Sequence, residues 1–118
     1  MEKYLVIEPC GEMRWIQTER KQLMQTFYAA IGCDCFETVR TMVPDVILIV
    51  DESGKVKTPP QEHNERASQL YRGYMISGDD IAGPAILASI GPVNGEMDIV
   101  PLNDLAFRRL TALGIITD

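Results

Sequence analysis

Asparagine, arginine and tyrosine side chains are concentrated in one short stretch in the middle of the chain. They are Asn64, Arg66, Tyr71, Arg72 and Tyr74, which together span eleven residues. An aromatic ring can stack on a nucleobase, and a guanidinium can hold a phosphate through paired hydrogen bonds. The residue types therefore indicate a site for a small nucleotide. The same pattern is also typical of a short amphipathic helix with tyrosines at the edge of the core and solvated arginines.

Two residues further along complete the predicted ligand-binding set. Asp80 lies in a Gly-Asp-Asp loop, and Gly83 follows at the entry to a strand rich in small residues. Glycine within a strand often marks a place where another group approaches the backbone closely. We therefore expect the entry at Gly83 to lie beside the Asn64 stretch and to form part of the same binding surface.

The acidic pairs of the chain offer an alternative chemistry. Asp51 and Glu52, Asp79 and Asp80, and the single histidine His63 could together hold a divalent metal if the fold brought them close. A carboxylate-dependent metal hydrolase is therefore one alternative function. Short acidic pairs are also common in solvated turns, and we predict no metal site and no cofactor.

The sequence contains no recognisable catalytic motif. It has no Gly-x-Ser-x-Gly elbow, and His63 lies in a polar stretch typical of an exposed helix start. Gly54-Lys55 lacks the upstream glycine and the following hydroxyl of a phosphate-binding loop. We therefore predict no catalytic residues and a protein that binds a ligand without transforming it.

Length and composition are those of one ordinary globular domain. The chain has 118 residues, of which 46% are hydrophobic and 24% charged, and we predict a single domain over residues 1–118. No apolar run reaches the ~20 residues that a membrane-spanning helix needs, and the first residues do not resemble a signal segment. We expect a cytoplasmic protein with no membrane partner.

The formal net charge of −6 argues against direct binding to nucleic acid, which depends on lysine and arginine neutralising phosphates. The three cysteines, Cys10, Cys33 and Cys35, are expected to be reduced thiols, with Cys35 inside a strand. Exposed strand edges generally need cover, so we also expect a homo-oligomer.

Hydrophobic patterns and turn residues predict strands separated by three helices. The strands are expected at 4–7, 13–17, 36–39, 46–50, 81–88 and 97–100, with a reversal at Asn94-Gly95. Without strict alternation of strands and helices, the order indicates an α+β fold. We predict a mostly antiparallel sheet packed with two main helices and one short helix.

Each predicted helix has a capping residue at its start. Thr18 is expected to cap the first helix, Asn64 the short second helix, and Asn103 the last helix. Leu102 is expected to pack against Phe107 at the start of the last helix. The buried stripes are then Leu23, Phe27, Ala30 and Ile31 in the first helix, Ala67, Leu70 and Tyr71 in the second, and Leu110 and Leu113 in the third.

Several short motifs carry a resemblance to a known family. They are LVIEP in the opening strand, the Gly32-to-Val39 stretch with Glu37, VILIVDESGK, Asn64-x-x-Ala67 and Asp80-Ile81-Ala82-Gly83. In these motifs the chain resembles the domain-of-unknown-function 3846 family of small phage, plasmid and conjugative-element proteins. The chain departs from that pattern in a longer Arg40-to-Asp45 connection and in Pro84. The resemblance implies an origin in a mobile element and supplies no catalytic residues.

The mobile-element context and the absence of a catalytic motif lead to one main hypothesis. We expect a non-catalytic protein that counters host defence by sequestering a small nucleotide signal. A second hypothesis is an inhibitor that docks on a host nuclease or a CRISPR-type complex, since an acidic protein suits a basic channel. The metal hydrolase described above and an accessory subunit of a larger assembly are the remaining alternatives.

Overall fold

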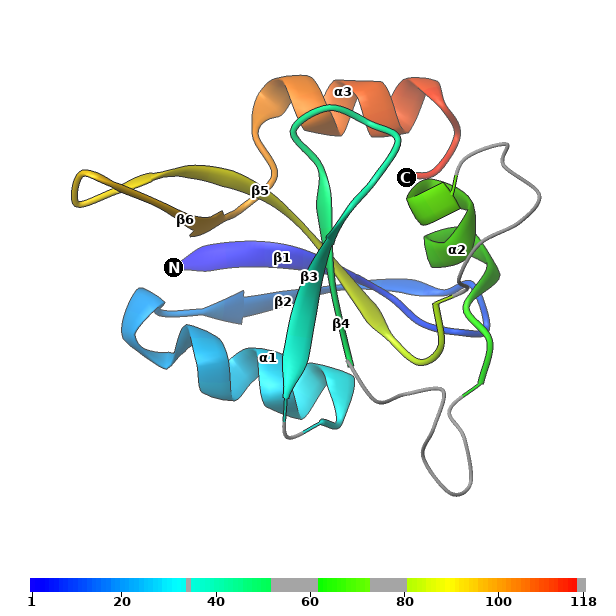
Figure 1. Cartoon of the computed structure of the whole chain (residues 1–118), viewed down its shortest axis with the longest axis horizontal. Coiled ribbons are helices and arrows are strands. Elements are labelled where there is room, and N and C mark those ends of the chain that lie inside the picture. Colours follow the sequence, from blue (N-terminus) through cyan, green and yellow to red (C-terminus); the bar gives the residue numbers. More distant parts are fainter. Residues whose placement is uncertain (34, 52–61, 73–80, 117–118) are drawn as a thin grey trace.

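The computed structural model describes residues 1–33, 35–51, 62–72 and 81–116, with Arg72 described by its backbone alone. A six-stranded antiparallel sheet forms the centre of the molecule (Figure 1). Its strands are β1 (Glu2–Ile7), β2 (Met13–Thr18), β3 (Phe36–Arg40), β4 (Ile47–Asp51), β5 (Ala85–Val93) and β6 (Glu96–Val100). The order is β2-β1-β5-β4-β3, and β6 pairs with the far half of β5.

Helices cover both faces of this sheet. A short 3-10 helix, η1 (Arg20–Gln22), leads into α1 (Leu23–Ile31), and α2 (Glu65–Arg72) and α3 (Asp104–Ala112) follow later in the chain. In Figure 1, α1 lies on one side of the sheet, while α2 and α3 lie on the other. The predicted fold class, an antiparallel sheet with two main helices and one short helix, is confirmed.

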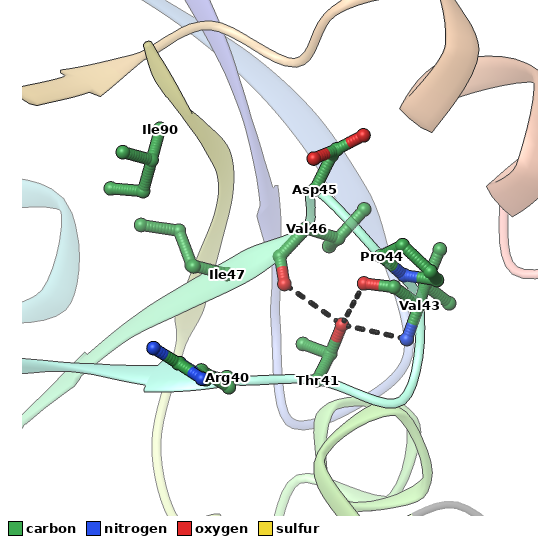
Figure 2. Close-up of a pocket in the computed structure, with 8 residues that line it drawn as sticks. All are labelled: Arg40, Thr41, Val43, Pro44, Asp45, Val46, Ile47 and Ile90. Carbon is green, nitrogen blue, oxygen red and sulfur yellow. Dashed lines mark hydrogen bonds between the residues drawn. The ribbon is translucent and has the colours of Figure 1, made fainter. Parts of the chain in front are cut away.

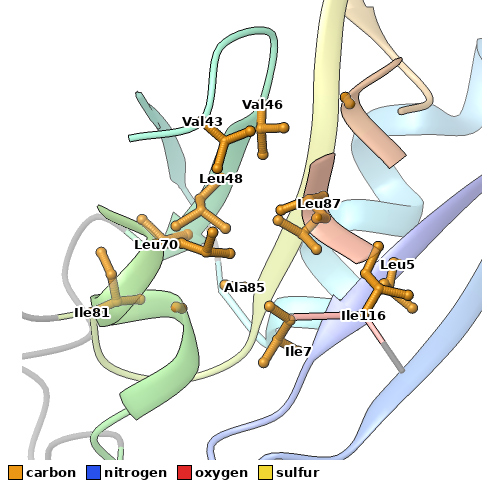
Figure 3. Close-up of a cluster of buried hydrophobic side chains, with 14 residues drawn as sticks. Leu5, Ile7, Val43, Val46, Leu48, Leu70, Ile81, Ala85, Leu87 and Ile116 are labelled. Carbon is orange, nitrogen blue, oxygen red and sulfur yellow. The ribbon is translucent and has the colours of Figure 1, made fainter. Parts of the chain in front are cut away.

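Strand β4 shows why the sheet has two cores. Leu48 and Val50 belong to the core beneath α2 and α3, shown in Figure 3, whereas Ile47 and Ile49 belong to the core beneath α1. Successive side chains of a strand point to opposite faces, so a strand covered on both sides must be apolar at every position. This burial explains the unbroken apolar run that precedes Asp51 in the sequence.

The core beneath α1 contains a buried tyrosine, Tyr4, whose hydroxyl reaches Glu2 at the start of β1. The rings of Tyr4 and Phe27 meet edge to face with centroids 4.9 Å apart. The Tyr4 hydroxyl donates a 2.6 Å hydrogen bond to Glu2, whose carboxylate also receives two 2.9 Å hydrogen bonds from Arg20. Burial and the adjacent Glu2 carboxylate raise the pKa of Tyr4 well above its usual value.

The start of the first helix differs from the prediction. Thr18 is the last residue of β2, paired with Glu2, and its hydroxyl lies 3.0 Å from the Glu19 carbonyl and 2.8 Å from the Thr26 hydroxyl. Strand pairing holds the backbone extended at this position, so the helix starts later, through η1. The predicted cap is therefore wrong. Of the predicted buried stripe, Leu23, Phe27 and Ile31 are buried and Ala30 is partly buried, and the predicted end of α1 at Gly32, with φ of 75°, is confirmed.

The end of the last helix and one cysteine also differ from expectation. Leu113 is 53% exposed, because the helix ends at Ala112 and the chain turns at Gly114, which has φ of 76°. Cys35 is exposed and precedes β3, whereas Cys33 is buried, and no disulfide joins the cysteines within the described part of the chain. The Asn103 cap is confirmed, since its side chain accepts a 2.8 Å hydrogen bond from the Ala106 amide.

The strand predicted over 81–88 begins four residues late. Gly83 has φ of 83°, a left-handed conformation that interrupts an extended strand, and Pro84 has no amide hydrogen to donate. Strand β5 therefore starts at Ala85 and continues to Val93. The reversal at Asn94-Gly95, where φ is 52° and 84°, is confirmed and joins β5 to β6.

Candidate functional site

The predicted ligand-binding stretch begins at a small antiparallel contact between two segments, 62–65 and 81–83, which we call the clasp. The backbone amide of Asn64 donates to the Ile81 carbonyl at 2.8 Å, and a second backbone hydrogen bond of 2.7 Å joins Gly83 to Glu62. The clasp brings together the start of α2 and the residues just before β5. It thus places two members of the predicted set, Asn64 and Gly83, side by side.

The side chain of Asn64 is fully occupied within the clasp. Its oxygen accepts a 3.1 Å hydrogen bond from the Ala67 amide, which confirms the predicted helix cap. Its nitrogen donates to the carbonyls of Ile7 and Gly83, both at 2.9 Å, and the residue is 0% exposed. Both amide hydrogens are therefore used by the protein itself, and we reassign Asn64 from ligand contact to the positioning of α2 against β1 and β5.

Ser68 reinforces the clasp and was missed from the sequence. Its hydroxyl accepts a 2.8 Å hydrogen bond from the Ile81 amide and lies 3.4 Å from the Ile81 carbonyl. Ser68 is one helical turn after Asn64, so both side chains lie on the same face of α2. The four-residue spacing of two small polar residues within an otherwise amphipathic helix was the available signal.

Gly83 also serves the clasp. It is buried, and its carbonyl accepts the Asn64 amide while its own amide donates to Glu62. The close approach to the backbone expected at this glycine is therefore made by other parts of the same chain.

Arg66 is the cationic member of the predicted set whose position the structure defines. It is partly exposed, and its Nη1 donates a 3.0 Å hydrogen bond to the Ile115 carbonyl. Its Nε would lie 3.8 Å from a Cβ placed on Gly11, so the guanidinium passes over the turn between β1 and β2. Among the described residues it meets no carboxylate, and its charge is left without a counter-ion.

Tyr71 lies at the edge of the core, partly buried and packed against the cluster that contains Ala67 and Leu70. Arg66 and Tyr71 are five residues apart on α2, which separates their directions around the helix axis by about 140°. The side chain of Arg72, and Tyr74 and Asp80, lie outside the described residues. Arg66 and Tyr71 therefore lie on the same helix but on different faces of it.

Of the predicted metal ligands, Asp51 and His63 are described. Asp51 is buried at the end of β4, and the His63 Nε2 lies 2.6 Å from the Glu65 carboxylate. Glu52, Asp79 and Asp80 lie outside the described residues. Within the part of the chain that the structure describes, no three His, Cys, Asp or Glu side chains are grouped as a metal site would require.

A separate pocket of about 300 Å³ lies where β3 turns into β4 (Figure 2). The residues that line it come from the ends of both strands, from the turn between them and from β5. They are Arg40, Thr41, Val43, Pro44, Asp45, Val46, Ile47 and Ile90. Sequence reasoning noted residues 40–45 as an unusual connection and did not identify a pocket there.

The turn beside this pocket is held by internal hydrogen bonds. The Thr41 hydroxyl accepts from the Val43 amide at 3.1 Å and lies 2.9 Å from the Val46 carbonyl, as the dashed lines in Figure 2 show. The Ser89 hydroxyl donates a 2.7 Å hydrogen bond to the carbonyl of Asp45, which has φ of 68°. These contacts fix the turn to β5, so the pocket exists before any ligand arrives.

Two charged side chains at the pocket differ in their partners. The Asp45 carboxylate lies 3.8 Å from Arg109 of α3, which also donates to the Pro44 carbonyl at 3.4 Å. Arg40 is exposed and has no carboxylate partner among the described residues. The unneutralised charge at the pocket is therefore positive.

Comparison with known proteins places the chain in a family. No curated protein and no solved structure matches it. None of the helices in the described part of the chain combines the length and the apolar character that crossing a membrane requires. The model of the family described as "Domain of unknown function (DUF3846)" matches residues 1–111, which extends from β1 into the last turn of α3. The chain belongs to this DUF3846 family.

Proposed function

We propose that the protein is a non-catalytic binding protein of a phage or another mobile element, which counters host defence in the cytoplasm by sequestering a small nucleotide signal. The observation that carries this proposal is Arg66, a guanidinium fixed on an anchored helix and left without a counter-ion among the described residues. Such a group favours an anionic ligand, because forked N–H donors match the geometry of phosphate.

The anchoring of α2 supports tight binding. Two hydrogen bonds donated by the Asn64 side chain, to the Ile7 and Gly83 carbonyls, and one that Ser68 accepts from the Ile81 amide hold the helix to β1 and to the entry of β5. A binding group that is already in place loses little conformational freedom when a ligand arrives. Sequestration needs affinity alone, so this arrangement suits a protein that removes a signal from solution.

Tyr71, which points about 140° away from Arg66 around the α2 axis, is proposed to contact the base of a ligand that extends around the helix from Arg66. Its ring is held at the edge of the core and keeps some exposed surface. Aromatic rings in this position offer a face or an edge to a nucleobase. Arg72, Tyr74 and Asp80 are the further residues that we propose for this site.

Isothermal titration calorimetry tests the proposal. The panel contains cyclic mononucleotides, cyclic dinucleotides and ADP-ribose-type nucleotides, each titrated into the wild-type protein. We expect at least one to bind, and Arg66→Gln to weaken it by about tenfold or more through loss of charged hydrogen bonds. Arg108→Gln removes an exposed arginine from α3 and is the matched control, expected to bind like wild type.

Two results would contradict this function. One is the absence of heat and of any thermal shift with the whole panel. The other is a bound nucleotide whose affinity falls equally in Arg66→Gln and in the Arg108→Gln control.

A protein-blocking function is the second candidate, and one surface favours it. A shallow apolar hollow of about 270 Å³ lies between the β3–β4 turn and α3, bordered by Met42 and Leu113, which are 48% and 53% exposed. Exposed apolar side chains around a hollow are common where proteins associate. Capture of a nuclease complex from host lysate by wild type, and loss of capture in Leu113→Asp, would favour this function over the nucleotide function.

A further inference from the structure

We infer that the pocket between β3, β4 and β5 is a second binding site, specific for a small organic anion that carries an apolar body. This inference concerns Arg40, Ile47 and Ile90, and it is independent of the nucleotide function proposed for Arg66 and Tyr71. The juxtaposition of one unpaired guanidinium with an apolar wall in a preformed hollow is the basis of the assignment.

Strand register places the three side chains on one face of the sheet. Arg40 pairs with Ile47 across β3 and β4, and Ile47 pairs with Ala88 across β4 and β5. Directly paired residues project to the same face, and Ile90 follows Ala88 by two positions on that same face. Figure 2 shows Arg40, Ile47 and Ile90 following one another along one side of the pocket.

The charges around the pocket favour an anion. The Asp45 carboxylate is directed away from the Arg40 guanidinium in Figure 2 and is paired with Arg109 at 3.8 Å. Arg40 has no carboxylate partner among the described residues, so a ligand anion would supply the missing counter-charge. Arg40 is exposed, so a ligand can reach its guanidinium, and binding breaks no ion pair among the described residues.

The apolar wall defines the rest of the ligand. Ile90 is 42% exposed although it belongs to a central strand, and Pro44 is exposed on the opposite rim. A pocket of about 300 Å³ is at the lower end of the range for small-molecule sites. The site would thus take a compact aromatic or aliphatic body that ends in a carboxylate, phosphate or sulfonate.

Fluorescence titration with 8-anilinonaphthalene-1-sulfonate tests this site, since the probe combines an aromatic body with one anionic group. We expect Arg40→Gln to weaken probe binding by about tenfold or more, and Ile90→Ser by a few-fold, because the first removes the charge and the second part of the wall. Arg108→Gln, which removes an exposed arginine from the middle of α3 that does not line the pocket, is the matched control and should bind like wild type. Competition with AMP and with decanoate then distinguishes a nucleotide from an acyl carboxylate.

Backbone amide NMR locates the probe and separates the two proposals. Perturbed resonances of Thr41, Asp45 and Ile47 are the expected result. The inference would be overturned if Arg40→Gln, shown to be folded by its thermal transition, bound the probe like wild type, or if the perturbations centred on Arg66 and Tyr71. Binding at the β3–β4 pocket together with no heat from the nucleotide panel would uphold this site and remove the nucleotide function.

Discussion

Helices α2 and α3 begin in the same way and are held by different means. Asn64 and Asn103 both accept a hydrogen bond from the backbone amide three residues later, at 3.1 Å and 2.8 Å. Asn64 is completely buried and also donates to two distant carbonyls, whereas Asn103 is exposed. Asn103 therefore stabilises the start of α3 locally, whereas Asn64, in the same kind of cap, joins α2 to β1 and to the entry of β5.

This difference determines how much each cap should contribute to stability. An exposed capping residue can be replaced by water when its side chain is removed. Removal of a buried amide leaves its partner carbonyls without a hydrogen bond, because neither water nor another group can reach them. Each unsatisfied carbonyl then carries its full desolvation cost. The comparison between the two asparagines can therefore be tested by graded substitutions.

Asn64→Asp should have the largest effect. The substitution keeps the size and the acceptor of the cap but removes both N–H donors and places a carboxylate against the carbonyls of Ile7 and Gly83. We expect unfolding free energy to fall by about 3–5 kcal/mol. Urea denaturation followed by circular dichroism measures this loss. A loss below about 1 kcal/mol would show that these buried contacts contribute no more than an ordinary exposed cap.

Ser68→Ala should have the next largest effect. It removes the acceptor of the buried Ile81 amide, and we expect a loss of about 2 kcal/mol. Gln69→Ala, which changes an exposed neighbour on the same helix, is the control and should stay within about 0.5 kcal/mol of wild type. Equal effects of the two substitutions in thermal unfolding would contradict the role given to the clasp.

Asn103→Ala should be milder, with a loss of about 1 kcal/mol. The Ala106 amide would lose its side-chain partner at an exposed helix start where water can replace it. Measurement under the same urea conditions as Asn64→Asp compares the loss of this exposed cap with the loss of the buried Asn64 donors. Equal losses from the two substitutions would show that the buried contacts of Asn64 add no more stability than an exposed cap does.

Tyr4→Phe should have the smallest effect at neutral pH, about 0.5 kcal/mol, because Glu2 keeps its hydrogen bonds to Arg20. Folding raises the pKa of Tyr4, so its protonated form is favoured in the folded state. The resulting stabilisation is complete below pH of about 10 and is lost as the pH rises towards the raised value. Wild type should thus lose stability more steeply than Tyr4→Phe above pH 10 in urea titrations, and parallel curves would refute this.

Local patterns in the sequence predicted the elements well where the cause is itself local. The caps at Asn64 and Asn103, the buried stripe of α1 and the turn at Asn94-Gly95 all depend on residues within a few positions, and all are present. The Thr18 cap failed because pairing of β2 with β1, a contact between strands, keeps that residue extended.

The candidate sites were harder to predict because they depend on contacts between distant segments. Nothing near Asn64 in the sequence indicates that its amide would be used by Ile7. Similarly, Arg40 and Ile90 share a pocket through the pairing of three strands, and the intervening Ile47 looked like an ordinary core residue. Strand order fixes such neighbours, and strand order was not deducible from the pattern of hydrophobic residues.

The pairing of β1 with β5 has a consequence for synthesis on the ribosome. Leu5 lies opposite Leu87, so β1 emerges from the ribosome some eighty residues before the strand that it pairs with. Until then, the β1–β2 hairpin carries apolar side chains on faces that the finished sheet covers. Non-local pairing of this kind slows folding and leaves nascent chains prone to aggregation. Production in the cell should therefore depend on chaperone supply and on the pace of translation through β5.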